Sequence, residues 1–430
     1  MSIIEKEQSI ITMLTKKFIE KTFPKGKLTL VGGHPAMGKT SFAISLTISL
    51  AELNRKCIYF SAELKEQQLV ERYKLQIDVE EYNVTAGNII VDDTSNINTN
   101  HIRKSIELYQ PDYIIVDYIQ LMSSNNQLSD RNTEMQAIVQ ELKTLASDCK
   151  IPIIGLSQLN RCQNDTSCFL NPNNYRELPL DYLEDINLTC IYRGDYFKKY
   201  EYDSNGEVMY GKTKFIIYHN NSPEFIYLLF NYETKGFSMF PSVMYIHGLS
   251  SSGASSTAIN LRKLLPKYDV LSPDLPIQPQ ESLTMLKELC ELYNPELIIG
   301  SSMGGMFAQQ LRGYKKILVN PAFHVSKFMR TQLGVHDFLN PRKNGETKYE
   351  ITLDLCDSYQ LIEANQFADI TDFDIKNTYA LFGTQDTLVH GYDEYIDYYR
   401  NAMWFEGEHR LNFEVIKNIV VPLVKIILRL

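Results

Sequence analysis

Short runs of β-branched and aromatic residues alternate along the chain with longer stretches in which apolar residues recur every three or four positions. The short runs predict buried strands, and the longer stretches predict amphipathic helices. Such alternation is typical of α/β folds built on parallel sheets. In the first half the predicted strands are Leu28–Val31, Cys57–Phe60, Tyr113–Val116, Pro152–Leu156, Leu188–Tyr192, Phe215–Tyr218 and Phe225–Phe230.

The alternation is interrupted at Asn231–Ser242, where glycine, serine and proline mix with polar residues. A second set of predicted strands then follows: Val243–Ile246, Tyr268–Leu271, Leu297–Ile299, Ile317–Val319, Tyr379–Phe382 and Met403–Phe405. The interruption predicts a domain boundary near residue 240. We therefore expect an N-terminal helix or linker over 1–24, one α/β domain over 25–240 and a second over 241–430.

Composition and charge narrow the class of protein. Of the 430 residues, 44% are hydrophobic and 22% are charged, so each half can bury a core of its own. The net charge of −9 argues against the basic surface of a non-specific DNA-binding protein and leaves local nucleic-acid binding open.

The sequence shows none of the patterns expected for an exported or membrane-spanning protein. Seven cysteines without a Cys-x-x-Cys pair are typical of reduced thiols. Met1–Ile10 lacks the apolar stretch of a signal peptide, and the apolar run Ile419–Leu430 is too short to span a bilayer. We expect a cytoplasmic protein without a membrane span, in which this run forms the last helix.

A phosphate-binding pattern, G-x-x-x-x-G-K-[ST], begins at Gly33 between a predicted strand and a predicted helix. Its glycines let the loop surround a phosphate with backbone N–H groups, and the following helix points its positive end at the anion. A glycine turn without a ligand is the alternative. We predict an ATP site with Mg²⁺ formed by Gly33, Pro35, Ala36, Met37, Gly38, Lys39, Thr40 and Ser41.

Three polar residues at the ends of predicted strands are candidates for the same site. Asp117 ends the apolar run after Tyr113, and beside a phosphate loop such a carboxylate binds Mg²⁺ together with Thr40. Glu63 follows the strand that begins at Cys57, and a surface glutamate near a helix start is the alternative. Gln158 follows the fourth predicted strand, with a structural role as its alternative.

Four segments resemble successive motifs of the ATPase domain of DnaB-type replicative helicases: VGGHPAMGKTSFA, IYFSAELKEQQLVER, IIVDYIQLM and LKTLASDCKIPIIGLSQLNR. The resemblance covers about residues 25–240. It implies a RecA-like P-loop NTPase fold, ATP with Mg²⁺, and a homo-oligomer that is often a ring. It assigns Glu63 to the catalytic glutamate, Asp117 to the metal site and Gln158 to the γ-phosphate sensor.

The chain departs from that family at two places. The family has a large helical domain before its ATPase domain, whereas about 24 residues precede the matching region of this sequence. Near the end of its ATPase domain the family carries a lysine and an arginine, two finger residues that act across the subunit boundary. In this sequence Tyr218 and Asn220 occupy the two finger positions. Because an arginine finger contributes about 10³–10⁵ in rate, its loss argues against fast ATP hydrolysis and strand unwinding and favours slow hydrolysis or nucleotide sensing. Arg161 and Arg193 are candidate substitutes.

The second half contains the pattern G-x-S-x-G from Gly300 to Gly304, between a predicted strand and a helix-like run. This context is typical of a nucleophile elbow and predicts Ser302 as the nucleophile. An acid and then a histidine must follow in chain order. Asp386 and His409 each follow a late predicted strand and are our candidates. The rival residues are His324, His390, Asp354, Asp374 and Asp393.

Two backbone N–H groups must stabilise the oxyanion of such a site. We predict the N–H of Met303, which follows the nucleophile, and that of Leu249, in the loop after the first strand of this half. His247 in the same loop has a structural role in this interpretation.

The segments MYIHGLSSS, IIGSSMGGMFAQQL, ILVNPAF, FGTQD and FEGEH resemble the small YqiA-type esterases, over about residues 241–430. The resemblance implies a small α/β-hydrolase domain that acts on simple acyl esters, with Ser302, Asp386 and His409 as its triad. Glu408, directly before the histidine, departs from the family pattern.

Three hypotheses follow for the whole chain. The first is a bifunctional protein in which nucleotide binding or assembly regulates a serine hydrolase. The second is a helicase-like DNA motor with an accessory hydrolase, and the third is a scaffold with two vestigial sites. Intact motifs in both halves favour the first.

Overall fold

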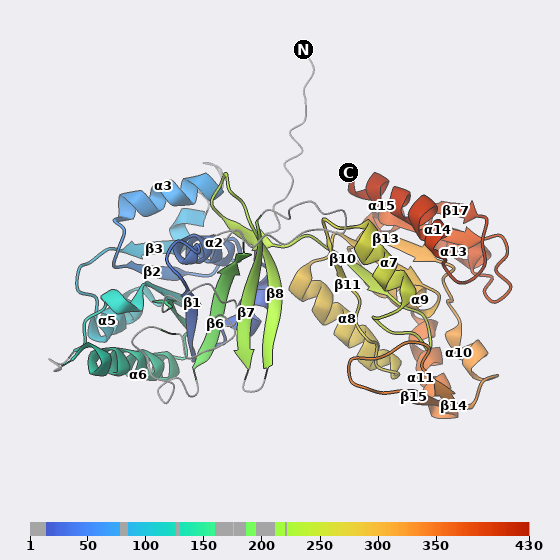
Figure 1. Cartoon of the computed structure of the whole chain (residues 1–430), viewed down its shortest axis with the longest axis horizontal. Coiled ribbons are helices and arrows are strands. Elements are labelled where there is room, and N and C mark those ends of the chain that lie inside the picture. The colour runs from blue at the N-terminus through green and yellow to red at the C-terminus, as the bar shows by residue number, and fades with distance from the viewer. Residues whose placement is uncertain are drawn as a thin grey trace, which may run out of the picture. The chain divides into compact units, whose positions relative to one another are not determined.

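The computed structural model describes residues 14–77, 85–125, 130–159, 175, 186–194, 211–219 and 222–429. These residues divide into two compact units (Figure 1). The first ends at Phe240, and the second begins at Pro241.

A nine-stranded sheet in the order β3-β2-β4-β5-β1-β6-β7-β8-β9 forms the centre of the first unit. From β3 to β6 neighbouring strands are parallel, and from β6 to β9 they are antiparallel. The strands are β1 (Leu28–Gly33), β2 (Cys57–Ser61), β3 (Ile89–Asp92), β4 (Tyr113–Asp117), β5 (Ile153–Gln158), β6 (Asn187–Arg193), β7 (Lys212–His219), β8 (Ser222–Phe230) and β9 (Phe237–Met239). All seven predicted strands are present. The sequence did not predict β3, which is only half-buried, or the three-residue β9.

Helices cover both faces of this sheet. They are α1 (Lys16–Thr22), α2 (Lys39–Glu52), α3 (Glu66–Gln76), α5 (Thr99–Tyr109) and α6 (Arg131–Cys149), with 3₁₀ turns η1 (Ala86–Asn88) and η2 (Ile119–Leu121). Apolar residues of α5 and α6 share a core with Ile216 of β7. The adjacent residue, Phe215, points to the other face, where its ring lies 5.3 Å from that of Phe18 in α1 and 5.0 Å from that of Phe42 in α2. The helix α1 therefore packs on the sheet of its own unit.

The second unit has a six-stranded parallel sheet in the order β11-β10-β12-β13-β16-β17. Its strands are β10 (Ser242–Ile246), β11 (Asp269–Leu271), β12 (Leu297–Ser301), β13 (Lys316–Val319), β16 (Thr378–Gly383) and β17 (Asn401–Phe405). All six coincide with predicted strands. A separate antiparallel pair, β14 (Gly334–Asp337) and β15 (Lys348–Ile351), was not predicted.

Two apolar cores lie on opposite faces of the second sheet, because successive residues of each strand point to alternate sides. Met244 and Ile246 belong to one core, and Val243 and Tyr245 belong to the other. The helices are α7 (Ser256–Leu264), α8 (Pro279–Tyr293), α9 (Met303–Gln310), α10 (Val325–Met329), α11 (Leu353–Ala364), α12 (Asp372–Asn377), α13 (Tyr392–Tyr398), α14 (Phe413–Val415), a π-helical turn (Ile416–Val420) and α15 (Val421–Leu428). The fold class α/β is confirmed. Among the helices of the described ranges, none is both long and apolar enough to cross a membrane.

One buried ion pair holds the second unit together away from any candidate site. Lys316 Nζ donates to Asp374 Oδ1 over 2.5 Å, and both side chains are fully buried. Burial alone would raise the pKa of Asp374, yet its hydrogen bonds to Lys316 and Thr371 hold that pKa below the usual value near 3.8. The pair therefore stabilises the fold above that pH, and its contribution is lost as the pH falls through the lowered pKa.

The change Asp374→Asn is expected to lower the free energy of unfolding by about 3–5 kcal/mol at neutral pH, because it leaves the buried Lys316 ammonium without its counter-ion. Urea denaturation at pH 7 measures the loss. Asp393→Asn, at an exposed position on α13, serves as the control and should change little. Equal stabilities of the two variants would contradict the assigned role of the pair.

Candidate active sites

The loop between β1 and α2 adopts the backbone conformation that a phosphate site needs. Ala36 and Gly38 both have a positive φ, of 63° and 94°. A side chain at Gly38 would bring its Cβ to 3.0 Å from the Phe237 ring, so glycine is required there for two reasons. The helix α2 then begins at Lys39 and has no acidic residue in its first turn. A loop with such φ values followed directly by a helix start is the arrangement in which backbone N–H groups and the positive helix end bind a phosphate.

Lys39 folds back over this loop. Its Nζ donates to the carbonyl oxygens of Gly33 and His34 over 2.9 and 3.1 Å. Burial lowers the pKa of Lys39, and the nearby carboxylate of Asp117 opposes this shift. A phosphate oxygen bound in the loop would offer the ammonium a stronger partner than two neutral carbonyls.

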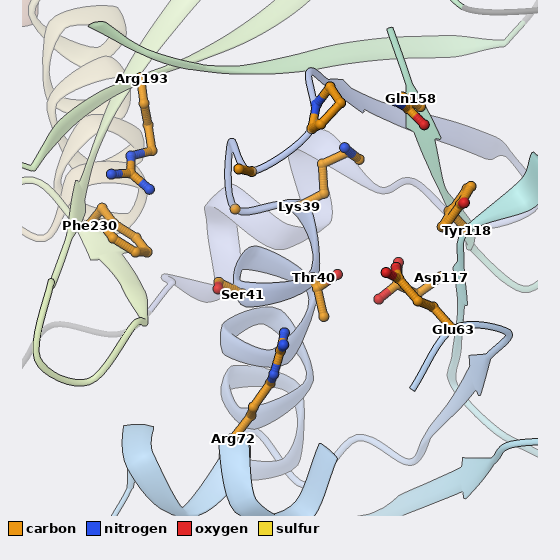
Figure 2. A pocket seen from close by; sticks show the side chains of 13 residues that line it. Lys39, Thr40, Ser41, Glu63, Arg72, Asp117, Tyr118, Gln158, Arg193 and Phe230 are labelled. Atoms are coloured by element: carbon orange, nitrogen blue, oxygen red, sulfur yellow. The ribbon is translucent and has the colours of Figure 1, made fainter. Parts of the chain in front are cut away.

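The residues predicted for Mg²⁺ lie together at the end of β4. Asp117 is 2% exposed and accepts hydrogen bonds from the hydroxyl of Tyr59 over 2.6 Å and from the side chain of Thr40. Burial raises the pKa of Asp117, and these hydrogen bonds oppose the rise. Glu63 lies beside Asp117 (Figure 2). A hydroxyl and a carboxylate oxygen at one point are the hard ligands that Mg²⁺ prefers, so these residues fit the ion.

A cavity of about 350 Å³ surrounds these groups (Figure 2). Nine of its lining residues were predicted: Pro35, Ala36, Gly38, Lys39, Thr40, Ser41, Glu63, Asp117 and Gln158. Three were not predicted, Arg72, Tyr118 and Phe230, and the last, Arg193, had been named only as a candidate substitute for the missing finger cations. Two predicted residues do not line it. The side chain of Met37 is buried in the core, and Gly33 ends β1 with its carbonyl oxygen accepting the hydrogen bond from Lys39.

Arg193, a candidate substitute for the missing finger cations, lines the nucleotide cavity. Its guanidinium lies 3.9 Å from the centre of the Phe230 ring and 5.4 Å from that of Tyr232. Arg193 ends β6, which is parallel to β1, so it reaches the edge of the sheet that carries the phosphate loop. Tyr218, at one finger position, is hydrogen-bonded to Cys190 within the unit. Asn220 and Arg161 lie outside the described residues.

In the second unit the three predicted triad residues meet. Nδ1 of His409 donates to Asp386 Oδ2 over 2.8 Å, and Nε2 of the same ring accepts from Ser302 Oγ over 3.0 Å. The other carboxylate oxygen of Asp386 accepts from the N–H groups of Leu388 and Val389 over 2.8 and 3.1 Å. The carboxylate is thereby fixed in orientation, and it fixes the histidine tautomer that can receive the serine proton.

The turn that carries Ser302 is strained and tightly packed. Ser302 has φ 54° and ψ −121° between β12 and α9, an uncommon conformation for a residue with a side chain. A Cβ at Gly300 would lie 2.3 Å from the Gly304 carbonyl oxygen, and one at Gly304 would lie 2.0 Å from that of Ile246. Only glycine fits at both positions, which accounts for the spacing G-x-S-x-G.

Both predicted oxyanion residues, Met303 and Leu249, line one cavity of about 710 Å³ with Ser302 and His409. His247 has a different role. It is 2% exposed, its Nδ1 donates to the Gly248 carbonyl, and its Nε2 accepts from the Leu275 N–H. Burial lowers its pKa, so the ring is a neutral structural link between two loops.

Two of the rival triad residues have ion-pair partners of their own. His324 pairs with Glu394 of α13, and Asp374 is the buried partner of Lys316. Asp354 and Asp393 lie in the first turns of α11 and α13, and His390 is exposed. In the described structure none of these five contacts Ser302 through a hydrogen bond.

Comparison with known proteins gives two separate matches. Residues 15–89 and 74–168 match the family model of the DnaB-like helicase C terminal domain, and residues 242–412 match that of an uncharacterised protein family, UPF0227. The first half carries a DnaB-like domain, and the second carries a UPF0227 domain. Both resemblances drawn from the sequence are thus confirmed.

Curated relatives match the DnaB-like domain. The replicative DNA helicase DnaB of Helicobacter pylori is 30% identical over 165 residues, which cover 32% of this chain and 34% of the relative. DnaB of Buchnera aphidicola is 27% identical over 218 residues, covering 44% and 47%. The chain thus spans about a third to a half of these relatives. Among solved structures, a DnaB-like replicative helicase described with its interactions with primase aligns with a TM-score of 0.45 and 20% identity over 55% of this chain and 64% of that one.

One further residue of the UPF0227 domain ties the triad loops together. Asn320 follows β13, is 2% exposed, and donates through Nδ2 to the carbonyl oxygens of Glu408 and His409, each over 3.2 Å. Its Oδ1 accepts from the N–H of Gly383 over 2.7 Å, three residues before Asp386. Asn320 is therefore a positioning residue that joins the acid loop to the histidine loop. The sequence analysis placed Asn320 within the segment ILVNPAF of the esterase resemblance but assigned it no role, because it lies outside the triad motifs.

For the serine hydrolase proposed below, the change Asn320→Ala is expected to lower kcat for ester hydrolysis by about 10- to 100-fold with little change in KM, because a small displacement of His409 weakens proton transfer more than substrate binding. Steady-state kinetics well below the unfolding temperature measure this split. Asn377→Ala is the matched control, since Asn377 also donates to a backbone carbonyl but lies in α12, away from the site. An unchanged kcat for Asn320→Ala would rule out the positioning role.

Proposed function

We propose that this chain is a bifunctional protein. The UPF0227 domain hydrolyses acyl esters with a serine nucleophile, and the DnaB-like domain binds Mg·ATP and hydrolyses it slowly. The observation that carries the first part is the chain of hydrogen bonds from Asp386 through His409 to Ser302, with distances of 2.8 and 3.0 Å. These are the distances at which a general base takes a proton from a nucleophile.

The first half-reaction forms an acyl-enzyme. Ser302 Oγ attacks the ester carbonyl carbon while His409 Nε2 takes the hydroxyl proton, and Asp386 stabilises the resulting imidazolium. The carbonyl oxygen becomes an oxyanion that accepts hydrogen bonds from the N–H groups of Met303 and Leu249, each contributing about 3 kcal/mol. The intermediate then collapses, the bond to the alcohol oxygen breaks, and His409 returns the proton to the departing alkoxide.

The second half-reaction reverses these roles. A water molecule gives its proton to His409 and attacks the acyl carbon, the same N–H groups stabilise the second oxyanion, and Ser302 Oγ leaves with the proton. The products are a carboxylic acid and the regenerated serine. No group beyond the triad and the oxyanion donors is needed.

In the DnaB-like domain, Lys39 would hold the terminal phosphates and Thr40 and Asp117 would hold Mg²⁺, which supplies charge neutralisation at the phosphates. Glu63 lies beside Asp117, where it can orient a water molecule. We infer slow hydrolysis because Tyr218, at one finger position, is neutral and bonded within its own unit. A homo-oligomer of this domain is part of the proposal.

The joining of the two domains in one chain leads us to propose that nucleotide binding changes the hydrolase rate. Hydrolysis of p-nitrophenyl acetate and butyrate is measured with and without Mg·ATP for the wild type and for Lys39→Ala. This variant lacks the ammonium group that we propose binds the phosphates. A rate that changes with Mg·ATP only in the wild type supports the coupling. Equal rates under all conditions refute it and leave two independent enzymes.

A second candidate function is a DNA motor, favoured by the 30% identity to a replicative DNA helicase. The net charge of −9 and the neutral Tyr218 argue against it. Strand separation of a forked DNA duplex in the presence of Mg·ATP tests this candidate. Separation that depends on Lys39 would favour the motor over the proposal above.

A further inference from the structure

The cavity around Ser302 has an apolar rim. Phe328, Leu339 and Leu388 line it and are 53%, 58% and 65% exposed. They come from three separate segments: Phe328 from α10, Leu339 from the loop between β14 and β15, and Leu388 from the loop that follows Asp386. Three distant segments thus present large apolar side chains at the cavity that contains the nucleophile.

The exposure of these apolar side chains to water is unfavourable compared with their burial. Burial of apolar surface is worth about 25 cal/mol per Å², so a ligand that covers them gains binding energy with each methylene. The occupant must also reach Ser302, since the rim and the nucleophile line one continuous cavity. An acyl chain whose carbonyl carbon lies at Ser302 satisfies both conditions.

Another part of the cavity lining is polar and neutral. It consists of Tyr245, Ser255, Ser256, Thr257 and Ser301. The phenol of Tyr245 is hydrogen-bonded to the hydroxyls of Thr257, Ser301 and Ser255. The five hydroxyls of this wall can each donate and accept. All five side chains are uncharged, so this wall itself suits a neutral hydroxyl-bearing group better than a phosphate or a carboxylate. The charged residues that line the cavity, Glu394 and Arg410, come from other segments of the chain.

We propose that the substrate of the UPF0227 domain is a neutral ester that joins an apolar acyl chain, longer than acetyl, to an alcohol with further hydroxyl groups. The acyl chain covers the apolar rim, and the hydroxyls of the alcohol bind the wall that contains Tyr245. This inference rests on the proposed serine hydrolase function and names its substrate class.

The acyl part is tested with p-nitrophenyl acetate, butyrate and octanoate. The expected kcat/KM rises by about 10-fold or more from acetate to octanoate, because more methylenes are buried. Phe328→Ala and Leu388→Ala should each reduce the octanoate-to-acetate ratio several-fold. Leu361→Ala is the control, because Leu361 is 73% exposed on α11 and does not line the cavity. A ratio near one in the wild type, or equal ratios in all variants, would overturn the acyl assignment.

The alcohol part is tested by comparing 1-octanoylglycerol with ethyl octanoate and with the 3-phosphate of 1-octanoylglycerol. The wild type should prefer the glycerol ester over both, and Ser256→Ala and Thr257→Val should reduce the preference over ethyl octanoate. Preference for ethyl octanoate or for the phosphate would refute a neutral hydroxyl-binding wall.

These measurements distinguish a wrong substrate class from a wrong hydrolase function. If Ser302-dependent cleavage of p-nitrophenyl acetate occurs without preference for octanoate or for the glycerol ester, only the substrate class is wrong. If none of these esters is cleaved, or if cleavage does not depend on Ser302, the hydrolase function fails and the substrate class fails with it.

Discussion

Replacing Ser302 by alanine is expected to abolish ester hydrolysis by the UPF0227 domain while leaving its fold intact. The change removes the oxygen that attacks the carbonyl carbon and leaves His409 without a proton to take. In serine hydrolases with such a triad, loss of the nucleophile lowers kcat by about 10⁶-fold. The release of p-nitrophenolate from p-nitrophenyl butyrate measures the rate.

The stability of this variant should change little, because alanine carries the same Cβ as serine at the strained φ of 54°. Ser358→Ala is the matched control, since the hydroxyl of this serine donates to a carbonyl within α11 and does not line the cavity. Its rate should equal that of the wild type. A Ser302→Ala protein that is folded and retains most of the wild-type rate would place the chemistry elsewhere.

Replacing Lys39 by alanine is expected to weaken binding of Mg·ATP to the DnaB-like domain by about 100-fold. The side chain of Lys39 is half-buried, its ammonium donates to carbonyl oxygens of the loop, and charge-assisted hydrogen bonds from it to phosphate contribute about 1.5–3 kcal/mol each. A loss of this size corresponds to about two powers of ten in Kd. Isothermal titration calorimetry with Mg·ATP measures the affinity.

The control for this variant is Lys104→Ala, which removes an exposed lysine from α5 of the same unit. It should bind Mg·ATP as the wild type does. Equal affinities of the Lys39 and Lys104 variants would mean that the loop does not bind phosphate and would remove the basis for the nucleotide site.

The parts of both sites that lie in short contiguous patterns could be predicted from the sequence. The defining residues of the phosphate loop, and those of the nucleophile turn, each lie within a few positions of one another in the sequence. Asp117, Asp386 and His409 could be predicted because each ends or follows a strand, and the carboxyl ends of parallel strands meet at one edge of a sheet.

Other parts depend on the order of strands, which local patterns do not contain. Arg193 reaches the nucleotide cavity because β6 lies beside β1, and Asn320 reaches the triad loops because β13 lies beside β16. The pair β14 and β15 was missed because these four-residue strands expose alternate side chains and lie outside the main sheet. Sequence periodicity has little signal in such short segments.

The central claim is that Ser302 forms a covalent acyl intermediate. The full-length protein is mixed with p-nitrophenyl butyrate, quenched in acid before turnover is complete, digested and examined by mass spectrometry, with Ser302→Ala treated in parallel. We predict one butyryl group on the peptide that contains Ser302 in the wild type and none on the same peptide of the variant. Cleavage of the ester without an acylated Ser302, or an acyl group on another residue that persists in the variant, would contradict the account.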